Sequence, residues 1–398
     1  MISVERATEI ILDTELEKGT ERVGIENAIN RILAENIYAD RDFPPFDRVT
    51  MDGIAIKFEE FQSGRRFFKK ENLAAAGSAQ LILQNPENCI EIMTGAILPE
   101  NADTVIRYED LDQKNDGFQI NLENVKPGQN IHRKGEDKKE SAVLIATGKL
   151  ISPAEIGVCA TVGKSKLLVK KLPAIVVISN GDELVEIEER PLSHQIRKSN
   201  NWSVRAFLQQ NGIHCDLAHL PDNQKIIEQE LKALTDKYDV LVLSGGVSMG
   251  QFDFIPQTLE SAGIELLFHK VSQRPGKPFW FGKKGNEKVV FAFPGNPVST
   301  FMCAIRYFLP WYKKKFQAAD FSPEAAVLSD NFEFKPDLTY FLQVKTFPGA
   351  ESKLNAKPIV GNGSGDLSNL VDADGFLELP KDRDKFRAGE IFPYYPFR

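Results

Sequence analysis

The feature that most constrains the fold is a succession of apolar and amphipathic segments between residues 172 and 320. The segments 174–178 and 240–243 are continuous aliphatic runs, and 199–210 and 222–235 have helical periodicity. Strands that are apolar throughout and alternate with amphipathic helices are typical of a parallel sheet covered on both faces. We therefore predict a doubly wound α/β domain, whose ligands would bind at the carboxyl ends of its strands.

In the regions on either side of this domain, apolar residues recur with a different spacing. Short apolar runs between turn residues predict a β-rich inserted domain at 47–140. The same pattern resumes after Pro310 and predicts a small C-terminal β-barrel at 325–398. Residues 1–46 and 141–171 are left to form an elongated linking domain. The predicted fold class is thus multidomain α/β plus β.

The first part of the linking domain has its own pattern. Residues 3–34 carry two apolar stripes at helical spacing, one on either side of Gly19. We predict two helices there, the second one around the stripe at 25–32.

Composition excludes several classes of protein. The 398 residues have a formal net charge of −7, which argues against a general nucleic-acid binder. The longest aliphatic runs, such as 174–178, are far shorter than the roughly 18 residues of a membrane-spanning helix. The first residues lack the apolar core of an export signal. We expect a cytoplasmic protein that binds neither nucleic acid nor membrane.

A glycine-rich segment, SGGVSMGQFD at 244–253, follows the apolar run 240–243. Gly245, Gly246 and Gly250 leave backbone N–H groups uncovered, and such a turn can hold phosphate oxygens. Ser248 would add a hydroxyl donor. A strand-to-helix turn without a ligand is the alternative, and the absence of a following GK[ST] disfavours a Walker A loop.

Two PGxP turns come next. Proline makes such turns stiff, and glycine allows a close backbone approach. Lys277 and its neighbour Arg274 would present fixed positive charge to an anion. The alternative is a pair of structural turns around a hairpin at 279–293, with Asn296 or Ser299 as a helix cap. The candidate ligand-binding residues of the two turns are Pro275, Gly276, Lys277, Pro294, Gly295, Asn296 and Pro297.

Four acidic residues, Asp52, Glu183, Asp222 and Asp253, lie at predicted turns. Carboxylates beside a phosphate site can hold Mg²⁺. Taken singly, each is better explained as a helix N-cap or a solvated turn residue than as a metal ligand. Asp222 directly precedes a predicted helix and fits an N-cap.

Taken together, these motifs resemble the molybdopterin molybdenumtransferases, the family of MoeA and the gephyrin E domain. The resemblance extends over essentially the whole chain and rests on six collinear motifs. They are PPFDRVTMDGIAI at 44–56, IMTGAILPENADTVIRYED at 92–110, SNGDEL at 179–184, SGGVSMGQFD at 244–253, RPGKPFWFG at 274–282 and FPGNPVS at 293–299.

The resemblance implies an activity and its participants. The chain would insert molybdenum from molybdate into adenylylated molybdopterin, release AMP and yield the molybdenum cofactor. It would use Mg²⁺ or another divalent cation and act as a homodimer of four-domain subunits. The molybdopterin adenylyltransferase and apo-molybdoenzymes are the further candidate partners.

The resemblance also implies roles for the acids. Asp52 and Thr94 of one chain would face Glu183, Asp222 and Asp253 of its partner, and these last three would hold the cation. Beyond this group, Lys277 would attract molybdate and Ser364 would lie near the cleft.

The chain departs from the family pattern at several positions. Arg48 adds a charge before Asp52, and Asn180 replaces a usual threonine. Leu338 and Gln343 stand where the family often carries arginines, which weakens the case for an arginine-lined molybdate site there.

Two other kinds of protein fit part of the sequence. A pterin adenylyltransferase or a nucleotide pyrophosphatase can share the α/β domain, and a non-catalytic scaffold could retain an idle site. The TMDG and MTGA motifs of a separate N-terminal region favour molybdenum insertion over the two enzymes. A scaffold would be expected to carry long linkers or further domains.

Overall fold

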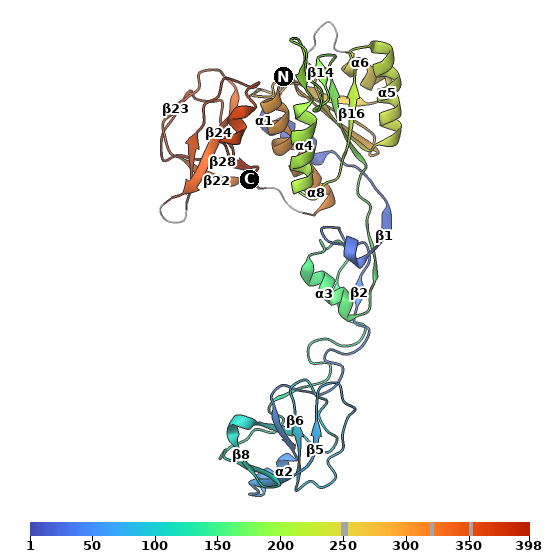
Figure 1. The fold of residues 1–398 in the computed structure, drawn as a ribbon, viewed down its shortest axis with the longest axis vertical. Coiled ribbons are helices and arrows are strands. Elements are labelled where there is room, and N and C mark those ends of the chain that lie inside the picture. The colour runs from blue at the N-terminus through green and yellow to red at the C-terminus, as the bar shows by residue number, and fades with distance from the viewer. Residues whose placement is uncertain (248–253, 319–321, 350–352) are drawn as a thin grey trace. The chain divides into compact units, whose positions relative to one another are not determined.

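The computed structural model describes residues 1–247, 254–318, 322–349 and 353–398 (Figure 1). No helix among these residues is both long and apolar enough to span a bilayer.

Contacts between residues divide the chain into two compact units. Unit 1 comprises residues 1–34, 148–152 and 166–398, and unit 2 comprises residues 35–147 and 153–165.

Unit 1 is built around a sheet with the strand order β16-β13-β17-β21-β20-β18. The first four strands are parallel, and β20 and β18 add to them in antiparallel fashion. The bounds are β13 Ile175–Asn180, β16 Asp216–Leu220, β17 Val240–Ser244, β18 Glu265–His269, β20 Trp280–Lys284 and β21 Lys288–Phe293. The predicted doubly wound α/β domain is confirmed.

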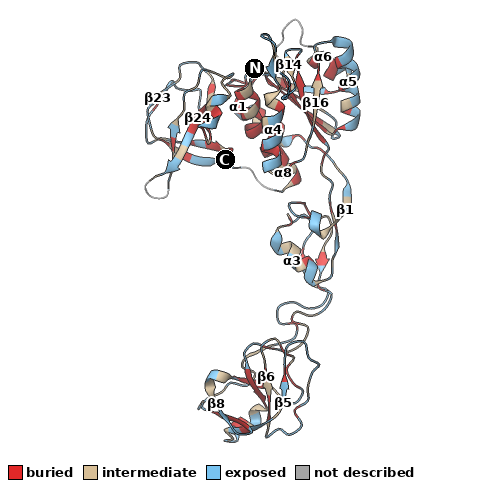
Figure 2. Cartoon of the chain, viewed as in Figure 1, coloured by how far each residue is buried: buried red, intermediate tan, exposed pale blue. Residues whose placement is uncertain are grey.

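Helices cover both faces of this sheet, because successive side chains of each strand point to opposite sides. Ile175 and Val177 of β13 pack in one core with α1, α4, α7 and α8, whereas Val176 and Ile178 pack in another with α5 and α6. The strands are accordingly buried (Figure 2). The helices are α1 Val4–Asp13, α4 Ser199–Gln210, α5 Gln224–Lys237, α6 Ile255–Ser261, α7 Pro297–Cys303 and α8 Leu309–Phe316.

Two expectations from the sequence are wrong. The stripe around 25–32 is not a helix: β1 (Thr20–Gly24) pairs with β12 (Lys166–Lys170), and only a short 3-10 turn follows. A strand partner 142 to 150 positions further along the chain overrides the local helical periodicity. β structure does not resume directly after Pro310 either, because the chain continues from α7 through a π-helical turn at Ala304–Phe308 into α8, which contains this proline.

The C-terminal part of unit 1 is the predicted small β-barrel. Its strands pair in the order β24-β25-β22-β28-β26, and β26 pairs again with β24 to close the sheet. A buried ion pair between Arg306, which lies between α7 and α8, and Glu378 of β26 joins the barrel to the α/β domain at 2.9 Å. The bounds are β22 Glu324–Leu328, β24 Thr339–Pro348, β25 Leu354–Pro358, β26 Gly375–Leu379 and β28 Ile391–Pro396.

Unit 2 contains a separate sheet with the order β7-β4-β6-β5-β9-β8. Its strands are β4 Gly53–Ile56, β5 Phe67–Ala74, β6 Cys89–Ile92, β7 Thr104–Arg107, β8 Leu111–Lys114 and β9 Gly117–Ile120. Two short strand pairs and two helices accompany it: β3 Arg48–Val49 with β10 Ile131–His132, β2 Ile37–Tyr38 with β11 Val143–Ile145, α2 Phe58–Gln62 and α3 Pro153–Thr161.

Replacing Gly276 tests how tightly the first PGxP turn, residues 275–278, is packed. It has φ +91°, and an added Cβ would lie 2.6 Å from Gln273 Nε2 and 2.8 Å from Cys303 Sγ. Gly276→Ala should therefore cost about 3 kcal/mol through backbone strain and overpacking. All three tryptophans lie in unit 1, so their fluorescence during urea unfolding reports this unit.

Gly285→Ala is the matched control. Gly285 also has positive φ, at +53°, but an added Cβ would meet nothing within 4 Å. Gly285→Ala should lower the free energy of unfolding by about 1 kcal/mol, through backbone strain alone. Equal costs at the two positions would contradict the packing described here.

Candidate active site

A cavity of about 600 Å³ lies at the carboxyl ends of β13, β17 and β21, the edge that the sequence predicted. Its wall comes from five parts of unit 1: the turns after these strands, the segment 196–201, Asp222, Pro278 and the barrel loop at Gly365. The lining includes Ser179, Asn180, Gly181, Glu183, Ser244, Gly245, Gly246, Val247, Pro278, Pro294, Gly295, Asn296 and Pro297.

Glycines allow the two turns at the centre of the cavity to touch. Gly245 and Gly246 have φ of +103° and +72°, where other residues are strained. A Cβ on Gly295 would lie 3.4 Å from Gly245 Cα, and a Cβ on Gly246 would lie 2.5 Å from Asn180 Oδ1. The other predicted residues of this turn, Ser248, Gly250 and Asp253, lie outside the described residues.

The second PGxP turn joins the cavity to the barrel. Asn296 Nδ2 donates to Ser364 Oγ at 2.8 Å, and Val298 N donates to the Ser364 carbonyl at 3.1 Å. The next barrel residue, Gly365, lines the cavity. Asn296 occupies the N-cap position of α7, but its side chain makes no capping bond there. The structure thus brings Ser364 to the rim of the cavity through Asn296.

The first PGxP turn contributes less to the wall. Pro275 and Gly276 are buried, and Lys277 is exposed. None of the three lines the cavity, which only Pro278 of this motif reaches.

Two of the predicted acids, Glu183 and Asp222, line the same cavity. Asp222 N donates to Asp182 Oδ1 at 2.9 Å, and Asp182 N donates to Asp222 Oδ2 at 3.3 Å, so the two turns hold each other. The predicted N-cap role of Asp222 is wrong, because Asn223 is the N-cap of α5 and accepts from Ile226 N. The Asp222 carboxylate is therefore not used as a cap.

Within the described ranges, no group of three or more histidines, cysteines or carboxylates is arranged to hold a metal ion. Mg²⁺, however, is commonly bound by one or two carboxylates together with substrate phosphates. The donor set of Glu183 and Asp222 fits that mode of binding.

Sequence reasoning missed two cations, Arg197 and Lys198, that line the cavity. They directly precede α4, whose N-cap residue, Lys198, makes no side-chain capping bond. The first N–H groups of a helix and its dipole favour an anion. The signal was present in the sequence as Arg-Lys before a predicted helix start at 199.

In unit 2, the structure brings the predicted Asp52 and Thr94 into contact. Thr94 N and Thr94 Oγ1 both donate to Asp52 Oδ1, at 2.6 and 2.7 Å. These bonds, the one from the backbone first, lower the pKa of the exposed Asp52 carboxyl below its ordinary value of 3.8. Asp52 is therefore an ionised and fixed acceptor at neutral pH.

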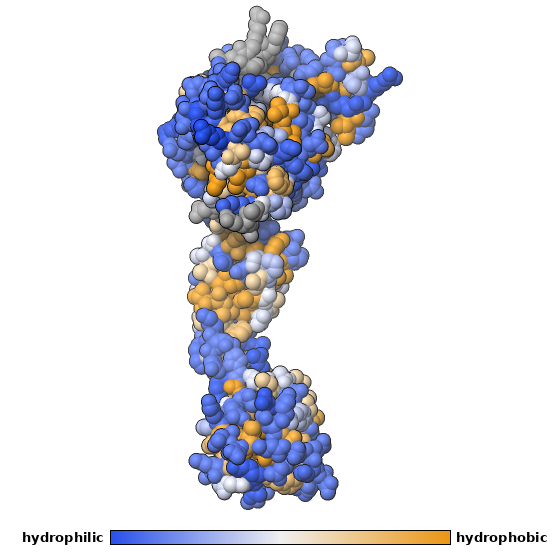
Figure 3. All heavy atoms as spheres, turned by 90° about the vertical axis from the view of Figure 1, so that its left-hand side faces the viewer, coloured by the Kyte–Doolittle hydropathy of each residue, from blue (hydrophilic) through white to orange (hydrophobic). Residues whose placement is uncertain are grey.

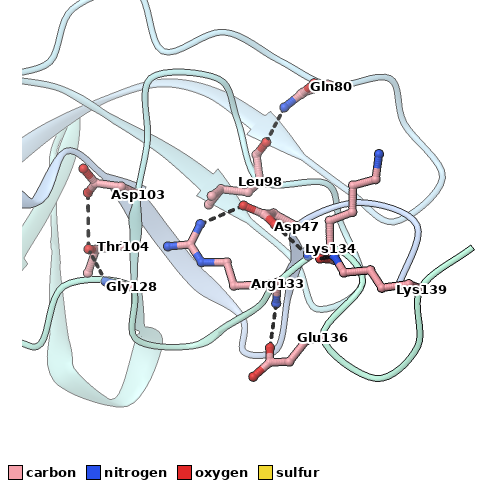
Figure 4. A network of polar contacts seen from close by, with 10 residues as sticks. All are labelled: Asp47, Gln80, Leu98, Asp103, Thr104, Gly128, Arg133, Lys134, Glu136 and Lys139. Atoms are coloured by element: carbon pink, nitrogen blue, oxygen red, sulfur yellow. Dashed lines mark hydrogen bonds and ion pairs between the residues drawn. The ribbon is translucent and has the colours of Figure 1, made fainter. Parts of the chain in front are cut away.

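A polar network holds the chain beside Asp52 in place. Asp47 accepts from Arg133 Nη1 at 2.7 Å and from Lys134 N at 2.8 Å, which ties the loop after β10 to the residues before β3 (Figure 4). In the same pair of strands, Arg48 Nη2 donates to His132 Nδ1 at 3.1 Å. The additional charge at Arg48 is thus engaged by a neighbouring strand.

Three family descriptions match the chain in consecutive order. Residues 2–163 match the MoeA N-terminal region (domain I and II), 176–314 a probable molybdopterin binding domain, and 325–397 the MoeA C-terminal region (domain IV). The doubly wound sheet with a cavity at its carboxyl edge coincides with the second match. The fold and the site therefore define a multidomain protein of the molybdopterin-binding class.

Similarity over the full length narrows this class. A molybdopterin molybdenumtransferase of Synechocystis sp. is 39% identical over 99% of this chain and 100% of its own length, and that of Haemophilus influenzae is 30% identical over 95% and 94%. A molybdopterin biosynthesis MoeA protein from Pyrococcus horikosii has a TM-score of 0.83 at 28% identity and covers 100% of this chain and 99% of its own. The chain belongs to the MoeA family of molybdopterin molybdenumtransferases.

The Thr94–Asp52 contact predicts a measurable change in titration. Thr94→Val removes the hydroxyl donor and keeps the backbone donor, so the pKa of Asp52 should rise part of the way towards 3.8. Carboxyl ¹³C NMR of Asp52 as a function of pH measures this pKa. Because the pKa of the folded state is lowered, the stabilisation by this contact is present above the ordinary pKa. It is lost as the pH falls through the lowered value.

Thr161→Val is the control, because Thr161 Oγ1 donates only to the Gly157 carbonyl in α3. It should leave the Asp52 titration unchanged. An Asp52 pKa that does not move in Thr94→Val would contradict the part assigned to the hydroxyl.

Proposed function

We propose that the protein transfers molybdenum from molybdate to adenylylated molybdopterin, releases AMP and so completes the molybdenum cofactor in the cytoplasm. The observation that carries this proposal is the match to molybdopterin molybdenumtransferases over the full chain, with a cavity at the expected edge of the sheet. A pterin adenylyltransferase or a pyrophosphatase would need only the α/β domain. The chain also carries both MoeA-specific regions, so molybdenum transfer fits best.

The anionic part of the substrate has a matching surface in the cavity. Arg197 and the start of α4 supply positive charge and N–H donors on one side, whereas the ammonium of Lys198 is already paired with Glu186 at 2.5 Å. The glycine turn at Gly245 and Gly246 lets a ligand approach the backbone closely on the other. Preorganised donors of this kind stabilise charge that develops as a phosphoanhydride breaks.

Glu183 and Asp222 would hold a divalent cation, with Asp253 as a further predicted ligand. When bound, the ion would neutralise charge on the phosphate oxygens. No protein nucleophile is required, because water can attack the adenylyl phosphorus: the phosphoanhydride bond breaks, AMP takes the new oxygen and the pterin keeps its phosphate. Lys277 is proposed to attract the molybdate oxyanion.

Asp52 and Thr94 belong to unit 2, whereas the cavity belongs entirely to unit 1. We assign them to the molybdate end of the reaction, where the ionised Asp52 orients donors of the substrate complex. The adenylyltransferase that makes the substrate and the apo-enzymes that receive the product are the proposed partners.

A homodimer would bring the two sets of residues together, and α3 offers it a surface. This helix carries Ile156, Val158 and Ala160, yet Cys159 is its only buried residue. Hydrophobic side chains gather over this part of the molecular surface (Figure 3). Nearby in unit 2, Tyr38 and Val143 are directly paired across β2 and β11, and both are exposed. We propose that a second copy of the chain covers this surface.

Ala160→Lys tests the dimer. It places a charge on the exposed apolar side of α3 and should shift the molecular mass, measured by light scattering after size exclusion, from dimer to monomer. Ala75→Lys, at an exposed position elsewhere in unit 2, should remain dimeric. A monomeric wild-type protein would contradict the proposal.

The activity is tested with purified full-length protein, adenylylated molybdopterin, Mg²⁺ and molybdate. AMP should appear, together with a product that reconstitutes an apo-molybdoenzyme. Asp222→Asn should slow both readouts on the order of 100-fold by removing a metal ligand. Asp236→Asn should not slow them, because Asp236 lies on α5 outside this cavity.

The two readouts separate the claims. Absence of AMP and of cofactor with the wild-type protein would contradict the proposed function. Full turnover by Asp222→Asn would contradict only the role given to that carboxylate.

A further inference from the structure

One loop of the barrel, residues 361–369, forms part of the cavity wall. Gly365 lines the cavity, and Ser364 Oγ accepts from Asn296 Nδ2 at 2.8 Å at its rim. Residues 359–367, all of them described, form neither a helix nor a strand, so no ladder of backbone bonds fixes their course. The position of this part of the wall therefore depends on individual hydrogen bonds.

The carboxylate of Asp366 joins the two ends of this loop. Its Oδ2 accepts from Asn362 N at 3.0 Å, and its Oδ1 accepts from Ser368 Oγ at 2.6 Å and from Asn369 N at 3.3 Å. These bonds, the one from Ser368 first, lower the pKa of Asp366 below its ordinary value of 3.8. Asp366 is therefore an ionised acceptor at neutral pH, with one oxygen bonded to each end of the loop.

A glutamine of the barrel sheet also supports the loop. Gln343 of β24 is only 9% exposed, and its Oε1 accepts from Asn369 Nδ2 at 3.0 Å. The Gln343 carbonyl accepts from Ile359 N, just before the loop, at 2.8 Å. Gln343 does not line the cavity. At a position where the family often carries an arginine, this chain thus has a residue that holds the loop.

Two bonds dock the loop onto the start of α7. Besides the bond from Asn296, the Ser364 carbonyl accepts from Val298 N at 3.1 Å. Val298 is the second residue of α7, and the first N–H groups of a helix have no partner within the helix. Ser364 supplies the acceptor for this N–H, so the Val298 amide reports whether the loop is docked.

Resting on the proposed substrate site, we propose that Asp366 is a positioning residue for that site. It holds the loop 361–369 in the shape that places Gly365 in the cavity wall and docks Ser364 onto α7. Without the carboxylate the loop would adopt several shapes, and substrate binding would have to order it at a cost in affinity. Asp366 itself does not line the cavity, so its effect falls on binding and not on the chemical step.

A second acid of the barrel provides a matched control. Glu390 accepts from Arg387 N at 3.0 Å and from Arg383 Nη1 at 2.8 Å within another turn. These bonds, the one from Arg383 first, lower the pKa of Glu390 below its ordinary value of 4.5. Glu390 does not line the cavity. Glu390→Ala therefore removes the same kind of turn contact from the barrel and leaves the wall unchanged.

Hydrogen exchange of the full-length protein without ligand tests the docking of the loop. In Asp366→Ala, the Val298 amide should exchange roughly tenfold faster than in the wild type, the loss expected for about one hydrogen bond. Asp366→Asn keeps one acceptor oxygen and the size of the side chain, so its rate should be intermediate. Glu390→Ala should not change the rate. Tryptophan fluorescence of each variant verifies that unit 1 is folded.

Steady-state kinetics with adenylylated molybdopterin tests the effect on binding. Asp366→Ala should raise KM for this substrate roughly tenfold and leave kcat unchanged, because it removes binding that the ground state and the transition state share. A partly unfolded variant would instead show a lower kcat at an unchanged KM. Glu390→Ala should change neither constant.

The remaining outcomes also decide. An unchanged Val298 amide in Asp366→Ala would overturn the proposal whatever the protein binds. Faster exchange at an unchanged KM, or a loss of kcat alone, would limit Asp366 to a structural role, which overturns the proposal and leaves the proposed function standing. If the wild-type protein releases no AMP, the proposed function fails and the effect on binding inferred here fails with it.

Discussion

The site depends on close packing of the backbone turns that follow three neighbouring strands. A single added carbon on Gly246, after β17, would lie 2.5 Å from Asn180 Oδ1 at the end of β13, and one on Gly295, after β21, would reach Gly245 Cα at 3.4 Å. A parallel sheet brings the ends of its strands to one edge, but side chains would ordinarily fill the space above them. Glycine at both turns keeps the backbone exposed there, and Asn200 bonds to the carbonyl of Gly295 and to Ser244.

The rest of unit 1 supports that edge. The barrel is attached to the α/β domain by the Arg306–Glu378 pair. Burial alone would lower the pKa of Arg306, but the neighbouring Glu378 more than offsets it and raises that pKa, so Arg306 stays charged. From this anchored barrel, the loop with Ser364 reaches Asn296 at the rim of the cavity. In the proposed reaction, Asp52 of unit 2 is assigned to the molybdate end and not to this cavity.

Much of this could be predicted from sequence, and the failures have physical causes. The helix 199–210 and the strands around it follow from local periodicity, and so do the barrel and the turns that line the cavity. The segment 20–27 could not be predicted locally, because β1 forms only by pairing with β12. The bonds from Asn200 Nδ2 to the Gly295 carbonyl and from Asn201 Nδ2 to the Ala218 carbonyl join segments up to 95 residues apart, which no local pattern encodes.

Hydrogen–deuterium exchange with adenylylated molybdopterin tests the central claim most directly, because ligand contacts suppress local opening. Peptides that cover residues 196–201, 244–247 and 294–297 should gain protection together, since these three segments form the wall of one cavity. Protection that is absent from all three, or confined to a separate cavity lined by Gln224 of α5 and Gln257 of α6, would show that the substrate binds elsewhere.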